Sequence, residues 1–366
     1  MLTSATEAVR WDAALNSHVI SGYAEASQVL RGQGWSSDPS DNPLAPPEMR
    51  DMPNAALVFM NPPDHTRLRS LLSPAFTPRA IERLRPRVAA IVESVLAGLE
   101  DQDEAEILAD VGQLVPLAVI TELLDAGLDG ARLFRDLTPD LFRLLEVNPT
   151  PGDLRAGIAA SAELALFLTP LIAERSVRPG DDFISAMLTT PDGPTLEQVL
   201  ATCLLLLAAG HETTANLITN GTYAVLGAPE RREQFLTDPD RAMAELMRVH
   251  GSVKLVGRVA QTDHDIAGHR VRAGEAVLIR LDEVARDPRR LPDPDRLDLT
   301  RDPAPNLAFG AGAHYCLGAA LSRVEVGETL TRLFHRFPRM ALTEAPVQWR
   351  DSSTFHGLVE LPVTLR

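Results

Sequence analysis

Apolar residues recur every three to four positions along most of this chain, which is the spacing of one face of an α-helix. On this basis, residues 80–190 are predicted to form a series of consecutive helices. Breaks between these helices are expected at 101–103, 127–130, 148–152 and 179–182. Residues 196 to about 226 predict a single longer helix of roughly 45 Å, at about 1.5 Å per residue. The pattern therefore predicts a mainly helical protein.

Alternation of apolar and polar residues, which is typical of strands, is confined to a few short segments. Strands or small sheets are expected at 8–12, 18–21, 252–260 and 265–279, and a closing hairpin at 355–365. A short helix is expected at 23–31. The β structure should thus form a small region beside the helices.

Residues 39–64 contain seven prolines and little periodicity, which predicts a long irregular loop. The apolar end of this loop, residues 57–60, has two equally good interpretations. It packs onto the core, or it forms a wall over a bound ligand.

Composition narrows the class of protein. Of the 366 residues, 45% are hydrophobic and 23% charged, as in soluble globular proteins. The net charge of −15 argues against a general nucleic-acid binder. We found no uninterrupted apolar stretch of about 20 residues and no secretory signal, so no membrane association is expected. Two cysteines do not make a disulfide framework, and a cytoplasmic location is expected.

Residues 309–326 combine a glycine-rich loop, one cysteine and the start of an amphipathic helix. Gly310, Gly312 and Gly318 surround Cys316, so several backbone N–H groups and a helix N-terminus should point at its sulfur. Such a setting favours a thiolate, which is either a nucleophile or a metal ligand. Taken alone, a single cysteine is more simply a small buried hydrophobe.

The long predicted helix carries an acid and an alcohol at its centre, Glu212 and Thr213. Gly210 weakens the helix there, and the Thr213 hydroxyl is placed to bond the carbonyl of Ala209 and bend it. This arrangement can hold water and relay protons. His211 and Glu212 do not form a zinc H-E-x-x-H site, because position 215 is alanine.

The segment F-G-x-G-x-H-x-C-x-G, residues 309–318, resembles the haem-binding loop of the cytochromes P450. The resemblance covers nearly the whole chain and implies one domain, residues 1–366. The implied fold is a triangular, mostly helical prism with a small β region. Haem b would lie between the long kinked helix and the cysteine-loop helix.

The resemblance also implies roles for individual residues. Cys316 would be the metal ligand, bound to haem iron as a thiolate, and Glu212 and Thr213 would be the catalytic acid and alcohol. The remaining residues assigned to the haem site are His65, Arg69, Ala209, Arg258, Ala308, Phe309, Gly310, His314 and Gly318. Of these, the histidines and arginines would neutralise the two haem propionates.

An E-x-x-R pair, Glu245 and Arg248, is commonly a surface pair worth under about 1 kcal/mol. In this family the pair is buried with a later arginine. Arg296 is the expected third member.

The implied function is a monooxygenase that inserts one oxygen atom from O2 into a small organic substrate, with hydroxylation in bacterial secondary metabolism as the expected reaction. A ferredoxin and a ferredoxin reductase would pass electrons from NAD(P)H to a monomeric enzyme. They would dock near Cys316 on a basic patch of arginines: Arg67, Arg79, Arg323 and Arg332. Substrate identity, regiochemistry and the choice of ferredoxin are not readable from the sequence.

Two alternatives keep the haem: a peroxide-using or aryl-coupling enzyme, and a haem sensor without turnover. A haem-free helical scaffold is the outermost alternative. The chain also departs from the family pattern. It has no counterpart of the usual N-terminal helix, and Ala285, Leu297 and Asn306 replace residues common in relatives.

Overall fold

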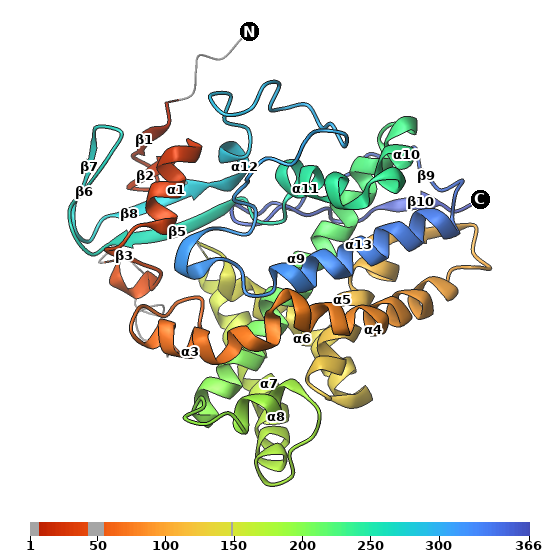
Figure 1. Ribbon diagram of the computed structural model, residues 1–366, viewed down its shortest axis with the longest axis horizontal. Helices are drawn as coiled ribbons and strands as arrows, with labels where there is room; N and C mark the ends of the chain where they lie inside the picture. The colour runs from red at the N-terminus through yellow and green to blue at the C-terminus, as the bar shows by residue number, and fades with distance from the viewer. Residues whose placement is uncertain (1–6, 43–54, 148) are drawn as a thin grey trace.

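The computed structural model describes residues 7–42, 55–147 and 149–366. Helices fill most of the molecule, and a sheet-rich region lies at one side (Figure 1). The large hydrophobic core lies among the helices, and a smaller one lies between the main sheet and α1 (Tyr23–Arg31). This agrees with the mainly helical protein and the small β region expected from the periodicity.

The main sheet has five strands in the order β1-β2-β8-β5-β3. Only the β2–β8 pair is parallel. The strands are β1 (Val9–Asp12), β2 (Ser17–Ile20), β3 (Trp35–Ser36), β5 (Leu255–Ala260) and β8 (Ala276–Arg280). The segment 265–279 was expected to form its own small sheet. Only β6 (His264–Ile266) and β7 (His269–Val271) do so, while β8 inserts between β2 and β5.

The helices match the predicted periodicity closely. They are α3 (Asp64–Leu72), α4 (Pro78–Ala97), α5 (Leu114–Leu123), α6 (Gly127–Phe142), α7 (Pro151–Val177), α8 (Phe183–Leu188), α9 (Leu196–Leu226), α10 (Pro229–Thr237), α11 (Pro239–His250), α12 (Leu281–Val284) and α13 (Ala319–Arg336). One expected break is wrong: residues 127–130 form the first turn of α6. The chain turns just before it, where Asp125 and Gly127 have positive φ.

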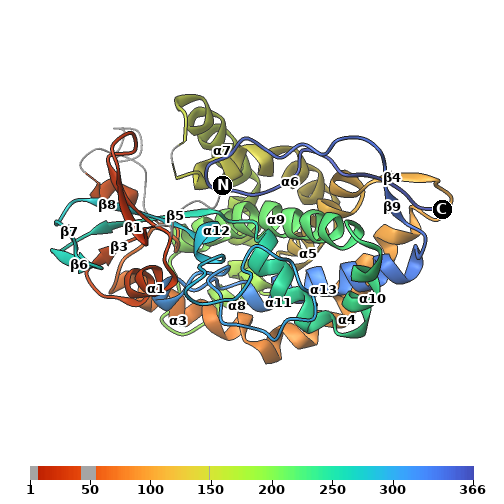
Figure 2. The ribbon, with the colours of Figure 1, turned by 90° about the horizontal axis from the view of Figure 1, so that it is seen from above.

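Helix α9 is the centre of the fold (Figure 2). It begins with a capping box in which Thr195 and Gln198 bond each other's backbone N–H groups. It then runs without interruption for 31 residues, as the sequence predicted. Helices α5, α6, α7 and α13 pack around it, which explains why most of its second half is fully buried.

The C-terminal segment does not form the expected closing hairpin. Its strand β10 (Pro362–Thr364) pairs instead with β4 (Glu104–Glu106) and β9 (Ala341–Leu342). The apolar residues Leu361 and Val363 are fully buried by this pairing. Apolar alternation identified the strand, but it carried no information about the distant partners.

Within the described residues, one helix, α7, is long and apolar enough to cross a membrane by length and composition. This is weak evidence, because core helices pass the same measure, and the inner face of α7 packs against α6 and α9.

Candidate active site

The loop before α13 is shaped by hydrogen bonds and by two glycines. Gly310 and Gly312 have φ values of 69° and 70°, a region that side-chain-bearing residues rarely adopt. The Cys316 N–H donates to the Phe309 carbonyl at 2.9 Å, and the Gly310 N–H donates to the Leu307 carbonyl at 2.8 Å. The loop thus holds Cys316 just before the N-terminus of α13.

Gly312 also fixes where this loop lies. A Cβ atom at this position would lie 2.1 Å from the carbonyl oxygen of Leu30, on α1. The bare backbone of the loop therefore packs directly onto the helix of the N-terminal sheet region.

Many protein atoms surround Cys316, yet the residue itself remains exposed. A residue that borders an internal hollow has both properties. Burial raises the pKa of the Cys316 thiol, although the Gly318 N–H, Arg69 and Arg323 each act to lower it. The Gly318 N–H of the loop thus acts in the expected direction, but burial outweighs it. A bound metal cation would supply the missing stabilisation, so the site suits a metal ligand better than a free nucleophile.

Two arginines and two histidines from three parts of the chain meet beside Cys316. His65 and Arg69 come from α3, Arg258 from β5 and His314 from the cysteine loop. The rings of His65 and His314 lie 4.1 Å apart, centroid to centroid. Burial, and then the neighbouring cations, lower the pKa of His65 and lower that of His314 to about 3.

No described carboxylate forms an ion pair with any of these four groups. Both ring nitrogens of His65 are buried without a partner among the described residues. Burial lowers the pKa of Arg258 to about 10, and the only described acceptor of its guanidinium is the carbonyl of Gly257. A buried positive cluster without a counter-ion requires an anion. The two propionates of haem b fit this requirement.

The middle of α9, which carries the acid and the alcohol, lies against the beginning of α13. The Thr214 hydroxyl lies 3.4 Å from that of Ser322, in the first turn of α13. The Thr213 hydroxyl donates to the Ala209 carbonyl at 2.5 Å, as the sequence predicted. The middle of α9 is therefore held near the cysteine loop.

Glu212 is almost fully buried, and its charge has one partner. The Arg350 Nη1 atom lies 2.8 Å from Glu212 Oε2, and Glu212 Oε1 has no partner within the described part of the chain. Sequence analysis missed Arg350 because nothing in the local pattern of the C-terminal segment links it to a helix 138 residues away.

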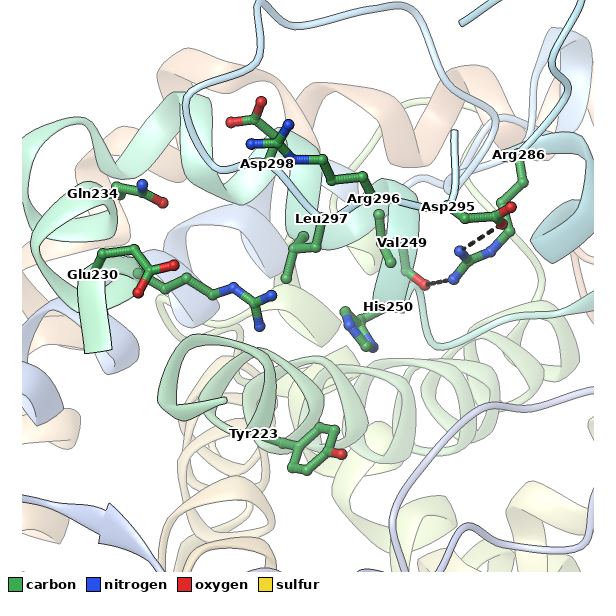
Figure 3. A pocket seen from close by; sticks show the side chains of 11 residues that line it. Tyr223, Glu230, Gln234, Val249, His250, Arg286, Asp295, Arg296, Leu297 and Asp298 are labelled. Carbon is green, nitrogen blue, oxygen red and sulfur yellow. Dashed lines mark hydrogen bonds and ion pairs between the residues drawn. The ribbon is translucent and has the colours of Figure 1, made fainter. Parts of the chain in front are cut away.

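The E-x-x-R network is buried, but its third arginine is Arg301. The Arg248 guanidinium donates two hydrogen bonds to Glu245, at 2.7 and 2.8 Å. Arg301 Nε donates to Glu245 Oε1 at 3.2 Å, whereas Arg296 contributes only its backbone carbonyl, to Arg248. The expectation for Arg296 is wrong, because its side chain lines a recess with Asp298 and does not bond Glu245 (Figure 3).

The remaining haem-site candidates lie along the same loop. Phe309 is covered by the Arg323 guanidinium, 4.6 Å from the ring centroid, and Gly318 caps α13. The Ala308 N–H donates to Asn306 Oδ1 at 3.1 Å, so this departure from the family pattern has a local function.

Two other expectations concern packing and docking. Leu57 and Met60 are buried in the large core, and most of the loop before them, 43–54, lies outside the described residues.

Of the four docking arginines, Arg332 is paired with Glu93 and Glu328, and Arg67 donates to Gln198. Arg323 remains exposed beside the cysteine loop.

Comparison with known proteins points to the same family as the cysteine-loop motif. Residues 239–359 match the cytochrome P450 family. The chain is 31% identical to the biotin biosynthesis cytochrome P450 of Bacillus subtilis, covering 94% of this chain and 89% of the relative. It is 34% identical to the monooxygenase PikC of Streptomyces venezuelae, covering 95% and 85% respectively.

Solved structures agree over the full length. The structure of P450BioI in complex with an acyl carrier protein ligated to hexadec-9Z-enoic acid superposes with a TM-score of 0.93 at 30% identity, covering 99% of this chain and 95% of that one. With this fold, this cysteine loop and these relatives, the chain belongs to the cytochrome P450 family.

Proposed function

We propose that this cytochrome P450 monooxygenase holds haem b through Cys316 and hydroxylates a small lipophilic metabolite. The observation that carries the proposal is the deep cysteine beside two arginines and two histidines without a described counter-ion. A porphyrin with iron at its centre and two propionates at its edge matches both features.

The chain's own residues have separate tasks in this proposal. Cys316 binds the iron, and His65, Arg69, Arg258 and His314 bind the propionates. When bound, thiolate-ligated haem iron activates O2 so that one oxygen atom enters the substrate while two electrons arrive from outside.

On α9, the Glu212 carboxylate would take up and release the protons that the reaction consumes, and the Thr213 hydroxyl would orient the water that carries them. The hydrogen bond from Thr213 to the Ala209 carbonyl fixes that hydroxyl in place.

The spectrum of the reduced protein with carbon monoxide tests the proposal. We expect the red-shifted Soret band of thiolate ligation in the natural protein and in Cys203→Ala, which alters the other, core cysteine. Cys316→Ser should lose the band. A folded, haem-loaded protein without this band, or a band that survives Cys316→Ser, would contradict the assignment.

For the substrate, we propose a lipophilic secondary metabolite such as a polyketide. One relative supports this class by name: the polyketide biosynthesis cytochrome P450 PksS of Bacillus subtilis. A carrier-bound acyl chain is a second candidate, favoured by the acyl-carrier-protein complex of the similar structure. Titration with free and carrier-bound compounds, followed by the shift of the haem absorption band, separates the two.

For electron supply, we propose NAD(P)H with a separate ferredoxin and ferredoxin reductase in the cytoplasm, docking beside Arg323. Its exposed position next to the cysteine loop supports this site. Turnover with peroxide alone, and none with a ferredoxin system, would instead favour the peroxide-using alternative.

A further inference from the structure

One face of α9 carries three buried polar side chains at intervals of four residues: Glu212, Asn216 and Asn220. Their exposed fractions are 1%, 0% and 0%. Each has polar atoms without a described partner: Oε1 of Glu212, both amide atoms of Asn216 and Oδ1 of Asn220. Residues four apart share a helix face, so these atoms form a line along α9.

The line leads to a recess beside the C-terminal end of α9, between α10 and α11. The recess has a volume of about 540 Å³ and is lined by Tyr223 and His250 among mostly charged residues (Figure 3). The Asn220 amide donates to the carbonyls of His250 and His356, at 3.2 and 3.0 Å. His250 Nδ1 is also buried without a partner. Unpartnered polar atoms thus continue from the recess to Glu212.

The spacing of this line suits water molecules. Four residues of α-helix rise about 6 Å, which is close to the span of two hydrogen bonds through one water. Buried waters typically bond polar groups that the protein leaves unsatisfied. Five unpartnered atoms in one line therefore point to ordered waters between them.

We propose that a chain of waters along Glu212, Asn216 and Asn220 carries protons from the recess to Glu212. Neutral amides do not ionise, so Asn216 and Asn220 are positioning residues that hold the waters. Each water passes one proton on and receives one, so the chain returns to its starting state after each transfer. This inference rests on the proposed role of Glu212 as the acid.

Gly357 provides a way to disturb the chain from outside α9. A Cβ atom at Gly357 would lie 2.2 Å from Asn216 Oδ1 and 2.6 Å from its Cγ. Its nearest neighbours are all atoms of the Asn216 side chain. Gly357→Ala should therefore displace the Asn216 amide, and Asn216→Ala in the same protein should relieve the clash.

The first test is a high-resolution crystal structure of the haem-loaded protein. We expect at least one ordered water within hydrogen-bond distance of both Asn216 and Glu212, and another between Asn220 and the recess. A well-ordered structure with no water along this line would overturn the proposal. This readout needs no variant and does not depend on whether Glu212 is the catalytic acid.

The second test is the solvent deuterium isotope effect on NAD(P)H oxidation with a surrogate ferredoxin system. Asn216→Leu and Gly357→Ala should each slow oxidation about tenfold and raise the isotope effect. Thr222→Val, which removes a buried hydroxyl elsewhere on α9, should change neither. A purely structural role for Asn216 would alter stability and leave the isotope effect unchanged, which would overturn the proposal.

A Glu212→Gln variant separates this proposal from the proposed function. If it oxidises NAD(P)H at the natural rate, the assigned role of Glu212 fails. If it is slow while Asn216→Leu is normal, only the water chain fails.

Discussion

Arg350 Nη1 lies 2.8 Å from Glu212 Oε2, so a residue near the end of the chain pairs with the acid at the centre of the longest helix. Glu212 is buried, whereas about a third of the Arg350 side chain is exposed (32%). The pair joins the C-terminal segment to the part of α9 that faces the cysteine loop.

Arg350→Ala should leave a buried carboxylate without its partner. We expect a loss of about 1–3 kcal/mol in the free energy of unfolding, less than for a fully buried pair because Arg350 is partly solvated. Urea unfolding of the single variants and of the double variant with Glu212→Gln measures the coupling. The double variant should be little worse than either single one, and strictly additive losses would contradict the pairing.

Arg301 and Arg296 offer a matched comparison. Arg301→Ala removes a partner of the buried Glu245 and should lower the free energy of unfolding by about 1–3 kcal/mol. Arg296→Ala leaves its backbone carbonyl in place and should change it by under about 0.5 kcal/mol. The denaturant midpoints of the two variants measure these losses of stability. A larger loss for Arg296→Ala than for Arg301→Ala would contradict the prediction.

Glu325, on α13, should make the protein less stable as the pH rises. Burial raises the pKa of its carboxyl from the model-compound value of 4.5 to about 8, and its Oε2 atom has no partner. Between these two values the folded protein holds a proton that the unfolded chain has lost. The free energy of unfolding should therefore fall with rising pH by up to about 1.4 kcal/mol per unit, and level off above about pH 8.

Glu325→Gln should remove this slope and raise the stability above pH 8. Thermal unfolding measured from pH 5 to 9 shows it, and Glu344→Gln, at an exposed position, serves as the control. Equal slopes in the natural protein and in Glu325→Gln would mean that Glu325 is ionised in the fold.

Arg258→Gln should have opposite effects on the haem-free and haem-loaded proteins. It removes one of the two buried arginines of this cluster, so the haem-free protein should become more stable. It also removes a propionate partner, so haem should be lost about 10- to 100-fold faster. Transfer of haem to an apoprotein acceptor measures this rate.

The exposed Arg83→Gln is the control for that experiment and should change neither property. Faster haem loss in both variants would point to a general charge effect and not to a propionate contact.

The sequence predicted structure within one segment better than it predicted pairing between distant segments. Periodicity predicted the bounds of α1 and α9, because amphipathic spacing and caps are encoded within each segment. It did not predict that β10 pairs with β4, since a short apolar strand does not specify its partner.

The same limit holds for the candidate site. The loop motif and the hydroxyl bond of Thr213 are local and could be predicted. Whether Arg296 or Arg301 reaches Glu245 depends on how the intervening turn folds. The raised pKa of the Cys316 thiol depends on burial by the assembled protein, which no local pattern contains.

The close packing of Gly312 on the Leu30 carbonyl ties α1 to the loop that carries Cys316, the proposed metal ligand. A side chain at 312, or a shift of α1, would move the sulfur without touching it. Substitutions in the first strands or in α1 should therefore change the haem absorption spectrum before any loss of helix is detected.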